Sequence, residues 1–196
     1  VPLKEGTDYV VESNTDIEAG FGTISISGKG NYAGQVSISY IISAASMTGL
    51  EENMVFEQEV VYTGSEVYPD IQVHDRKGKL LADGKDYDLI FSGAINVGTA
   101  KVKAVFRGNY TGSISKSFYI KPAVISDIVL SENEFVYNGK EHRPTAVGYR
   151  PGDYEVSYRE NVNAGKALAI FSFYGNYTGT VTKEFMIGPR KVLPPY

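Results

Sequence analysis

Hydrophobic and polar residues alternate along most of this chain with a period of two. Ile24 and Ile26 alternate with serines, and the same alternation runs through "QVSISYII" at 35–42. Because successive side chains of a β-strand point to opposite faces, this pattern predicts strands with one buried face. No stretch of comparable length has the 3.6-residue period of an amphipathic helix. The pattern therefore predicts an all-β protein.

The same alternation returns in two later parts of the chain. Ile114, Phe118 and Ile120 alternate with serines. Apolar or aromatic residues also occupy every second position of 87–91 and of 154–158, beginning with the Tyr. "TVTKEFMI" at 180–187 closes the series. Short strands, one-sided alternation and frequent turn residues favour antiparallel sheets packed face to face.

A set of residues recurs at fixed spacing in three places. Each Tyr of an Asp-Tyr pair is followed 22 residues later by the Asn of an Asn-Tyr-x-Gly motif, with a Gly 11 residues before that Asn and an aromatic residue nine after it. The pairs are 8–9, 86–87 and 153–154, and the asparagines are Asn31, Asn109 and Asn176. Identical spacings at several anchors indicate a tandem repeat.

The repeat sets the predicted domain boundaries. A front half is present twice, as "VYTGSEVYP" ending at Pro69 and "VYNGKEHRP" ending at Pro144. We therefore expect a partial first copy at 1–44, complete copies at 45–121 and 122–189, and a tail or the start of a further copy at 190–196. Because the first copy lacks about two strands, its sheet is expected to have an open hydrophobic edge. A neighbouring copy covers that edge or another chain pairs with it, so edge-strand self-association through the first copy is a hypothesis.

The motif at the end of each copy reads "GKGNYAG" at 28–34, "FRGNYTG" at 106–112 and "FYGNYTG" at 173–179. A dinucleotide-binding Gly-rich loop precedes a helix, whereas this motif precedes a further strand. We interpret it as a hairpin corner in which Asn and Gly adopt left-handed conformations. The Tyr of the motif is expected to fold back over the end of the core.

Taken in order, Tyr-x-Gly, Pro, Asp-Tyr, Asn-x-Gly, Gly-Asn-Tyr-x-Gly and a closing aromatic-x-Ile resemble the immunoglobulin-like repeats of large surface proteins of Gram-positive gut bacteria. The likeness covers the second and third copies and the back half of the first, which has "EAGFG" at 18–22 in place of Asn-x-Gly. It implies tandem immunoglobulin-like antiparallel β-sandwich repeats, secreted or attached to the cell wall, that act as spacers or adhesive modules. It brings no catalytic or ligand-binding residues.

Composition excludes several functions. The 196 residues carry a net charge of −4 with no cluster of Lys or Arg, which argues against a nucleic-acid partner. No apolar run reaches the roughly 20 residues of a membrane-spanning helix. The absence of Cys removes disulfides, thiolate nucleophiles and Cys-based zinc sites, and it fits an extracellular bacterial protein. We expect no cofactor.

Metal-binding candidates are few. Asp83, Asp86 and Asp88 flank a predicted hairpin and are the best candidates for a calcium site, because hard cations prefer several oxygen ligands. The pairs 51–52 and 132/134 are further acidic clusters, and the favoured interpretation of all of these residues is that they are exposed turn residues. His74 and His142 are expected to be solvated strand residues.

Lys116 and Lys183 lie at inward positions of the last strand of their copies. An intramolecular Lys–Asn amide bond is one interpretation of this placement. The favoured one is that each side chain extends its ammonium group to the solvent.

The resemblance implies a non-catalytic structural or adhesive region of a bacterial cell-surface protein, and this is the leading functional hypothesis. Enzyme activity is not expected, because nothing resembles a catalytic nucleophile with its base. Its partners would be host or cell-wall glycans or proteins. The alternative is a carbohydrate-binding module of a secreted or surface glycosidase, which would bind sugars on exposed aromatic rings. Its candidate ligand residues are tyrosines outside the repeat register: Tyr68, Tyr119, Tyr149 and Tyr174.

Overall fold

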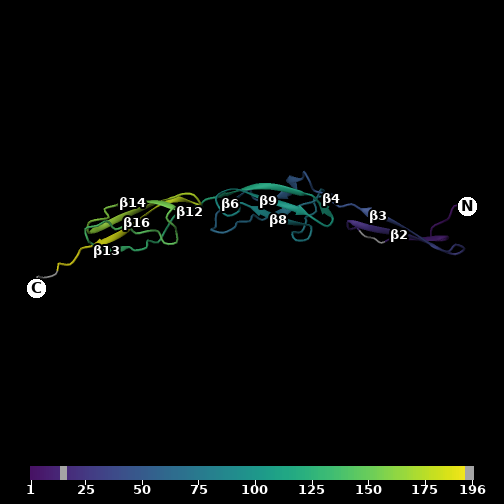
Figure 1. Cartoon of the computed structure of the whole chain (residues 1–196), viewed down its shortest axis with the longest axis horizontal. Helices are drawn as coiled ribbons and strands as arrows, with labels where there is room; N and C mark the ends of the chain where they lie inside the picture. The colour runs from purple at the N-terminus through teal and green to yellow at the C-terminus, as the bar shows by residue number, and fades with distance from the viewer. Residues whose placement is uncertain (14–16, 193–196) are drawn as a thin grey trace. The chain divides into compact units, whose positions relative to one another are not determined.

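The computed structural model describes residues 1–13 and 17–192, which form β-strands joined by turns (Figure 1). The one helical element among them is a single 3-10 turn, η1 (Glu51–Asn53), so the all-β prediction is confirmed. None of the helical structure in this part of the chain is long and apolar enough to cross a membrane. The chain divides into two compact units: unit 1 holds residues 1–57, 70–92 and 101–117, and unit 2 holds 58–69, 93–100 and 118 onward.

Unit 1 begins with an antiparallel sheet in the order β1–β2–β3, formed by Tyr9–Ser13, Gly20–Gly28 and Gln35–Ile42 (Figure 1). Within the described residues β3 has no strand on its outer edge, as expected for a first copy without a front half. Phe21, Ile38 and Ile41 are exposed on this sheet. β1, β2 and β3 therefore form a three-stranded sheet with exposed apolar side chains.

The middle of the chain forms a sheet in the order β6–β11–β9–β8, from Glu59–Val61, Ser113–Lys121, Gly98–Phe106 and Tyr87–Ser92. Two short pairs accompany it, β4 (Ala45–Ser46) with β10 (Tyr110–Thr111) and β5 (Met54–Val55) with β7 (Gln72–Val73). The buried side chains of unit 1 come from these elements and the loops between them: Met47, Met54, Val73, Leu81, Tyr87, Val102, Ala104, Phe106, Tyr110 and Ile114.

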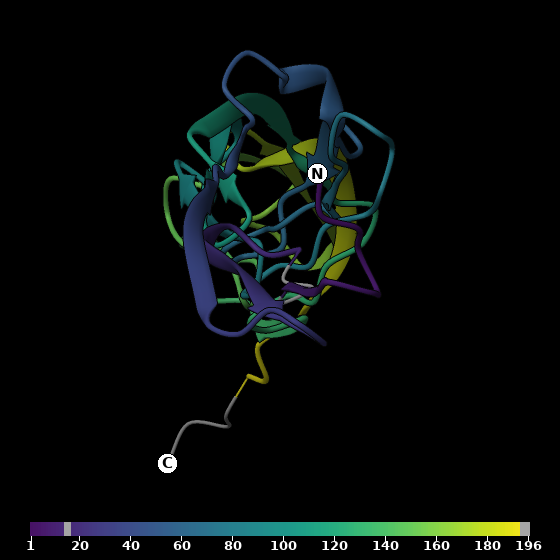
Figure 2. The same ribbon diagram turned by 90° about the vertical axis from the view of Figure 1, so that its right-hand side faces the viewer.

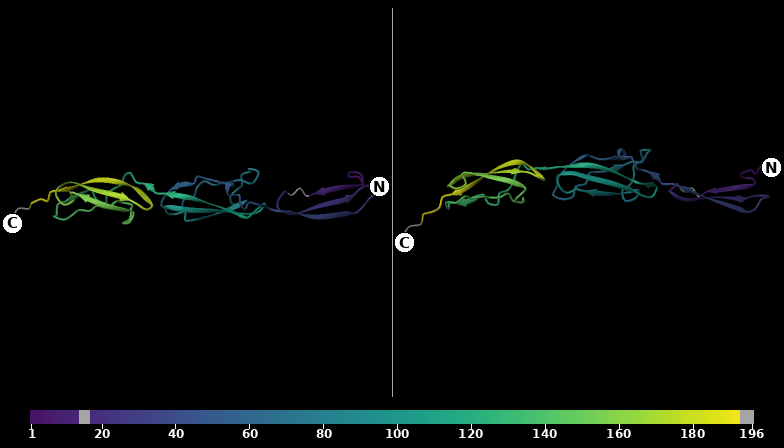
Figure 3. Two further views of the ribbon diagram at one scale, coloured as in Figure 1. Left: turned by 90° about the horizontal axis from the view of Figure 1, so that it is seen from above. Right: turned by 45° about the horizontal axis from the view of Figure 1, so that its top comes forward.

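Unit 2 contains a sheet in the order β12–β16–β15–β14, in which β13 also pairs with β16 (Figure 3). Its strands are Ala123–Val124, Glu134–Val136, Tyr154–Arg159, Gly165–Phe173 and Tyr177–Gly188, from β12 to β16. The core is formed by Ile128, Ala146, Tyr154, Ala167, Ala169, Phe171, Phe173, Val181, Phe185 and Ile187. After β16 the chain continues as a segment, yellow in Figure 2, that pairs with no strand among the described residues.

The strands of the second and third predicted copies match in length and burial. β8 and β14 each have six residues whose odd positions face inward, starting with buried Tyr87 and Tyr154. β9 and β15 each have nine residues and bury every second one from Ala100 and Ala167 onward. The alternation at 87–91 and 154–158 therefore predicts the inward faces of β8 and β14 correctly.

The prediction of purely antiparallel sheets is wrong at the sheet edges. β8–β9, β14–β15 and β15–β16 are antiparallel, but β6 pairs with β11, and β13 with β16, in parallel. The short pairs β4–β10 and β12–β16 are parallel as well. Parallel and antiparallel strands have the same two-residue side-chain period, so alternation does not reveal direction.

The three recurrent motifs form hairpin turns, as predicted. Gly30, Gly108 and Gly175 have φ angles of 68°, 67° and 71°, in the left-handed region that glycine adopts without a steric penalty. The predicted left-handed conformation of the asparagines is wrong, because Glu160 is the only non-glycine residue with positive φ in the described part of the chain. The recurrence of Asn therefore has another cause.

Candidate interaction surfaces

The three aspartates proposed for calcium do not converge. Asp83 accepts a hydrogen bond from the Gly84 N–H and Asp86 one from the Ala82 N–H, both at 2.9 Å. Asp88 forms an ion pair with Arg107 at 2.9 Å. Each carboxylate therefore has its own partner within the hairpin.

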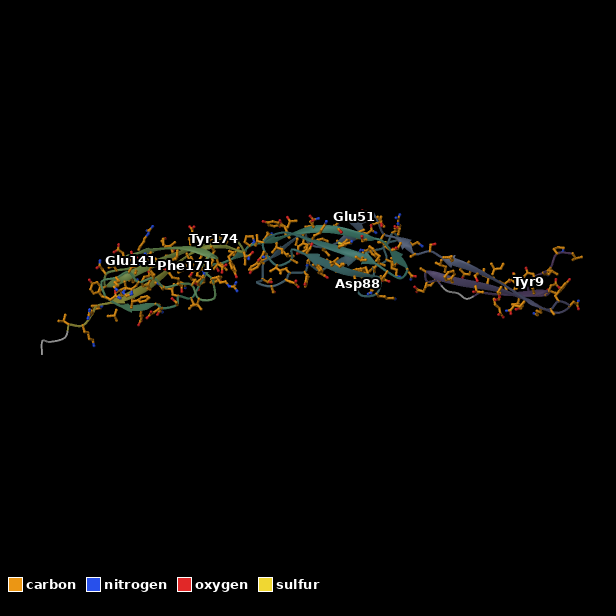
Figure 4. The ribbon with its side chains drawn as sticks, viewed as in Figure 1. Tyr9, Glu51, Asp88, Glu141, Phe171 and Tyr174 are labelled. Atoms are coloured by element: carbon orange, nitrogen blue, oxygen red, sulfur yellow. The ribbon has the colours of Figure 1, made fainter. Side chains whose placement is uncertain are left out.

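The remaining acidic clusters are exposed. Glu51 and Asp88, labelled in Figure 4, lie on opposite sides of this part of the chain in that view. Among the described residues no group of three or more His, Asp or Glu side chains is arranged to hold a metal ion.

The four candidate tyrosines lie in different surroundings. Tyr149 is half-buried and packs edge-to-face on Phe173 and Tyr177, with ring centroids 4.8 and 5.2 Å apart. It contributes to the core of unit 2 and offers no open platform. Tyr68, Tyr119 and Tyr174 are 54%, 43% and 47% exposed. Tyr68 follows β6 and donates a hydrogen bond to Glu66, Tyr119 lies on β11, and Tyr174 (Figure 4) lies in the β15–β16 turn.

The expectation of solvated histidines is wrong for His142. Its side chain is buried and packs on the Phe135 ring, with centroids 4.6 Å apart. The Nε2 atom has no hydrogen-bond partner among the described residues. Asn161 fixes the local backbone, because its carbonyl accepts from the His142 N–H and its Nδ2 donates to the His142 carbonyl. Asn53 makes the same pair of bonds to half-buried His74.

The two inward lysines reach oxygen acceptors. Lys116 Nζ donates to the Met54 carbonyl at 2.6 Å, and Lys183 Nζ pairs with Asp127 at 2.5 Å. The Asp127 carboxylate is mostly exposed, which agrees with a side chain extended toward the solvent.

The asparagine of the recurrent turn contacts the preceding predicted copy. In unit 1, Asn109 Oδ1 accepts a hydrogen bond from the Ala19 N–H at 2.6 Å, and its Nδ2 donates to Glu18. In unit 2, Asn176 Oδ1 accepts from the Val97 N–H at 2.8 Å, and its Nδ2 donates to Asn96 Oδ1 at 3.0 Å. Ala19 precedes Gly20, the first residue of β2, and Val97 precedes Gly98, the first residue of β9. The two contacts are therefore equivalent by sequence position.

The tyrosine of the turn adds apolar contact. Tyr177 packs edge-to-face on Tyr62, with ring centroids 5.4 Å apart. Burial is the main cause that raises the pKa of Tyr177, and the interaction with the Tyr62 hydroxyl raises it further. Tyr110 is buried, as predicted, and donates a hydrogen bond to Asp75 at 3.2 Å. Tyr32 of the first turn is 46% exposed, so the predicted folding back holds for two turns of the three.

Linker strands pair with the same turns. The Ala45 and Met47 N–H groups donate to the carbonyls of Asn109 and Thr111 at 2.8 and 2.9 Å. The Ala123 and Ile125 N–H groups donate equivalently to Asn176 and Thr178 at 3.0 and 2.8 Å.

Glycine closes each of these paired turns because the linker passes next to it. A Cβ on Gly112 would collide with Thr48, and one on Gly179 would collide with the Ile125 carbonyl. The final glycine of the motif is therefore explained by packing as well as by its positive φ.

Asp75 anchors the loop beside the first of these turns. Partial burial alone would raise the pKa of this carboxyl, but hydrogen bonds from the Lys79 and Lys77 N–H groups and from Tyr110 lower it. Asp75, Asn109 and Tyr110 line a groove with Ile17, Met47 and Arg76 in unit 1.

Sequence reasoning noticed the recurrent Asn but assigned it a local role. A signal was present, since glycine already fills the left-handed positions of the turn and Asn has no backbone reason to recur.

A search of family models finds none that matches this chain, and a search of curated proteins also finds no match.

Proposed function

We propose that this chain is a non-catalytic structural region of a bacterial cell-surface protein, formed by tandem immunoglobulin-like repeats that act as spacers. The observation that carries the proposal is the equivalent contact of Asn109 with Ala19 and of Asn176 with Val97. A contact that recurs at successive copies serves to hold neighbouring copies, and repeat proteins draw part of their stability from such interfaces.

The strand arrangement supports the repeat assignment. β8, β9 and β11 follow each other as β14, β15 and β16 do, and the parallel edge strands β6 and β13 pair with the equivalent last strands. Copies of about 70 residues bury only around 60% of their unfolded surface, so contacts to neighbours contribute much to their stability. The resemblance supports an extracellular location, and the absence of Cys is compatible with it.

The spacer role is tested by measuring how rigidly the second and third copies are joined. Because the chain has no Cys, single cysteines at exposed Ser65 and Lys140 can carry a pair of spin labels without background. We expect a narrow distance distribution that broadens in Asn176→Ala. Asn31→Ala, at the exposed first turn, is the matched control. An unchanged distribution in Asn176→Ala contradicts the proposal.

Adhesion through sugars is the competing outcome, favoured by the exposed rings of Tyr68, Tyr119 and Tyr174. A glycan and extracellular-matrix array probed with the full chain separates the two. If the repeats act only as spacers, we expect no binding to any glycan or matrix protein of the array. Reproducible glycan binding that disappears in the triple Ala variant of these tyrosines identifies a carbohydrate-binding module.

A further inference from the structure

The third predicted copy exposes the surface that receives the Asn-Tyr turn in the second copy. Gly165 follows Ala164 as Gly98 follows Val97, and Tyr137 follows β13 as Tyr62 follows β6. The backbone agrees, because the Tyr62 N–H donates to the Lys121 carbonyl and the Tyr137 N–H to the equivalent Gly188 carbonyl. Tyr137 and Ala164 therefore correspond to Tyr62 and Val97 at the occupied junction.

These receiving groups have no partner in the described part of the chain. The Ala164 N–H donates no hydrogen bond there, and the Tyr137 ring is 39% exposed. The linker 190–192 corresponds to 123–125, yet its N–H groups pair with nothing among the described residues (Figure 2). Tyr137, Ala164 and 189–192 line one groove in unit 2, the acceptor groove.

The first predicted copy exposes the complementary half. The turn 29–34 carries Asn31 and Tyr32, both exposed, at the positions of Asn176 and Tyr177. No linker strand pairs with this turn among the described residues. Glu5 and Asp8 lie at the same end of the sheet, since the Asp8 carbonyl accepts from the Lys29 N–H and Glu5 bridges to Tyr9. Lys4 and Lys29 lie at this end as well, so its charges balance, and the match to the acceptor groove rests on Asn31 and Tyr32.

We propose that the 29–34 turn of one molecule binds the acceptor groove of a second copy of this chain, head to tail. Asn31 Oδ1 accepts from the Ala164 N–H, Tyr32 packs on Tyr137, and the linker 190–192 pairs with the turn. The two surfaces differ, so the contact is heterologous and adds molecules without closing a ring. Within one molecule the equivalent contact benefits from the high effective concentration of a short linker, so association between free molecules is weak.

Sedimentation velocity from 10 µM to about 1 mM tests the proposal. The wild-type average mass is expected to rise with concentration above the monomer mass of 21.4 kDa. Tyr137→Ala removes the acceptor and the double variant Asn31→Ala/Tyr32→Ala removes the donor. Each is expected to associate at least tenfold more weakly than wild type.

Sedimentation of a mixture of the two variants is the decisive experiment. The Tyr137→Ala chain keeps a donor and the double variant keeps an acceptor, so an equimolar mixture should form a one-to-one dimer and nothing larger. Tyr174→Ala, at an exposed ring outside the groove, should associate like wild type. A monomer throughout the range overturns the proposal. So does association that persists in both variants, which would indicate the open edge of β3 instead.

Discussion

At the scale of single residues, the recurrent asparagines show how one side chain can join two segments far apart in sequence. The amide of Asn176 accepts from the Val97 backbone and donates to Asn96, which uses both of its functional groups. An aspartate could accept but not donate, and a glycine could do neither. The residue type thus follows from the two hydrogen bonds rather than from the local turn.

His142 is the residue whose burial is hardest to reconcile with its chemistry. A buried polar atom without a hydrogen bond costs about 1–3 kcal/mol, and Nε2 lacks a partner among the described residues. Replacing His142 with Phe keeps a ring against Phe135 and removes that atom. We expect the free energy of unfolding to rise by about 1 kcal/mol. Urea denaturation measures this, with His74→Phe at a half-buried position as the control. A loss of more than about 1 kcal/mol would show that Nε2 has a stabilising partner.

Asp75 predicts how stability responds to acid. Its pKa is lowered in the folded protein, so its contribution is present above the pKa of the unfolded chain, about 3.9, and is lost as the pH falls through the folded value. Asp75→Asn removes this titration. The urea midpoint should therefore fall less between pH 6 and pH 3 in Asp75→Asn than in wild type. Asp70→Asn, at an exposed aspartate, should retain the full wild-type fall, and equal falls in all three proteins would refute the role of Asp75.

At the scale of elements, the hairpins are what the sequence predicts best. The alternation at 87–91, 154–158 and 180–187 identifies both the strands and their buried faces. Strand direction at the sheet edges was not predictable, because it depends on where a distant segment such as β13 meets β16. The burial of His142 and the contacts of Asn109 were missed for the same reason, since both arise from packing between segments distant in sequence.

Each predicted copy has one tyrosine that follows an Asp, and these three tyrosines share a local sequence pattern but differ in packing. Tyr87 and Tyr154 are buried, whereas Tyr9 is only half-buried because its sheet lacks a covering sheet among the described residues. Replacing Tyr87 or Tyr154 with Ala should cost roughly 3–5 kcal/mol of unfolding free energy. Tyr9→Ala should cost about 1 kcal/mol, since little burial is lost. Chemical denaturation compares them, and equal costs at all three positions would contradict the incomplete first copy.

At the scale of the whole molecule, the Asn side chains of the turns contact the preceding predicted copy. The recurrent spacing can be read from the sequence alone, and the repeat and the partial first copy that it predicts stay predictions. The candidate site was not, since the sequence pointed to aspartates that do not converge and to a tyrosine, Tyr149, that belongs to the core. Each contact joins a recurrent Asn side chain, which is visible in the sequence, to a backbone N–H group, which leaves no trace in side-chain patterns.

The most direct test compares amide hydrogen exchange at three equivalent positions, Ala19, Val97 and Ala164, in dilute protein by NMR. We expect the Ala19 and Val97 amides to be protected from exchange, because their N–H groups donate to Asn109 and Asn176. We expect fast exchange at Ala164. Asn109→Ala should expose only Ala19, and Asn176→Ala only Val97. Equal exchange at all three amides, or protection that survives both substitutions, would contradict the claim that the Asn turn joins successive copies.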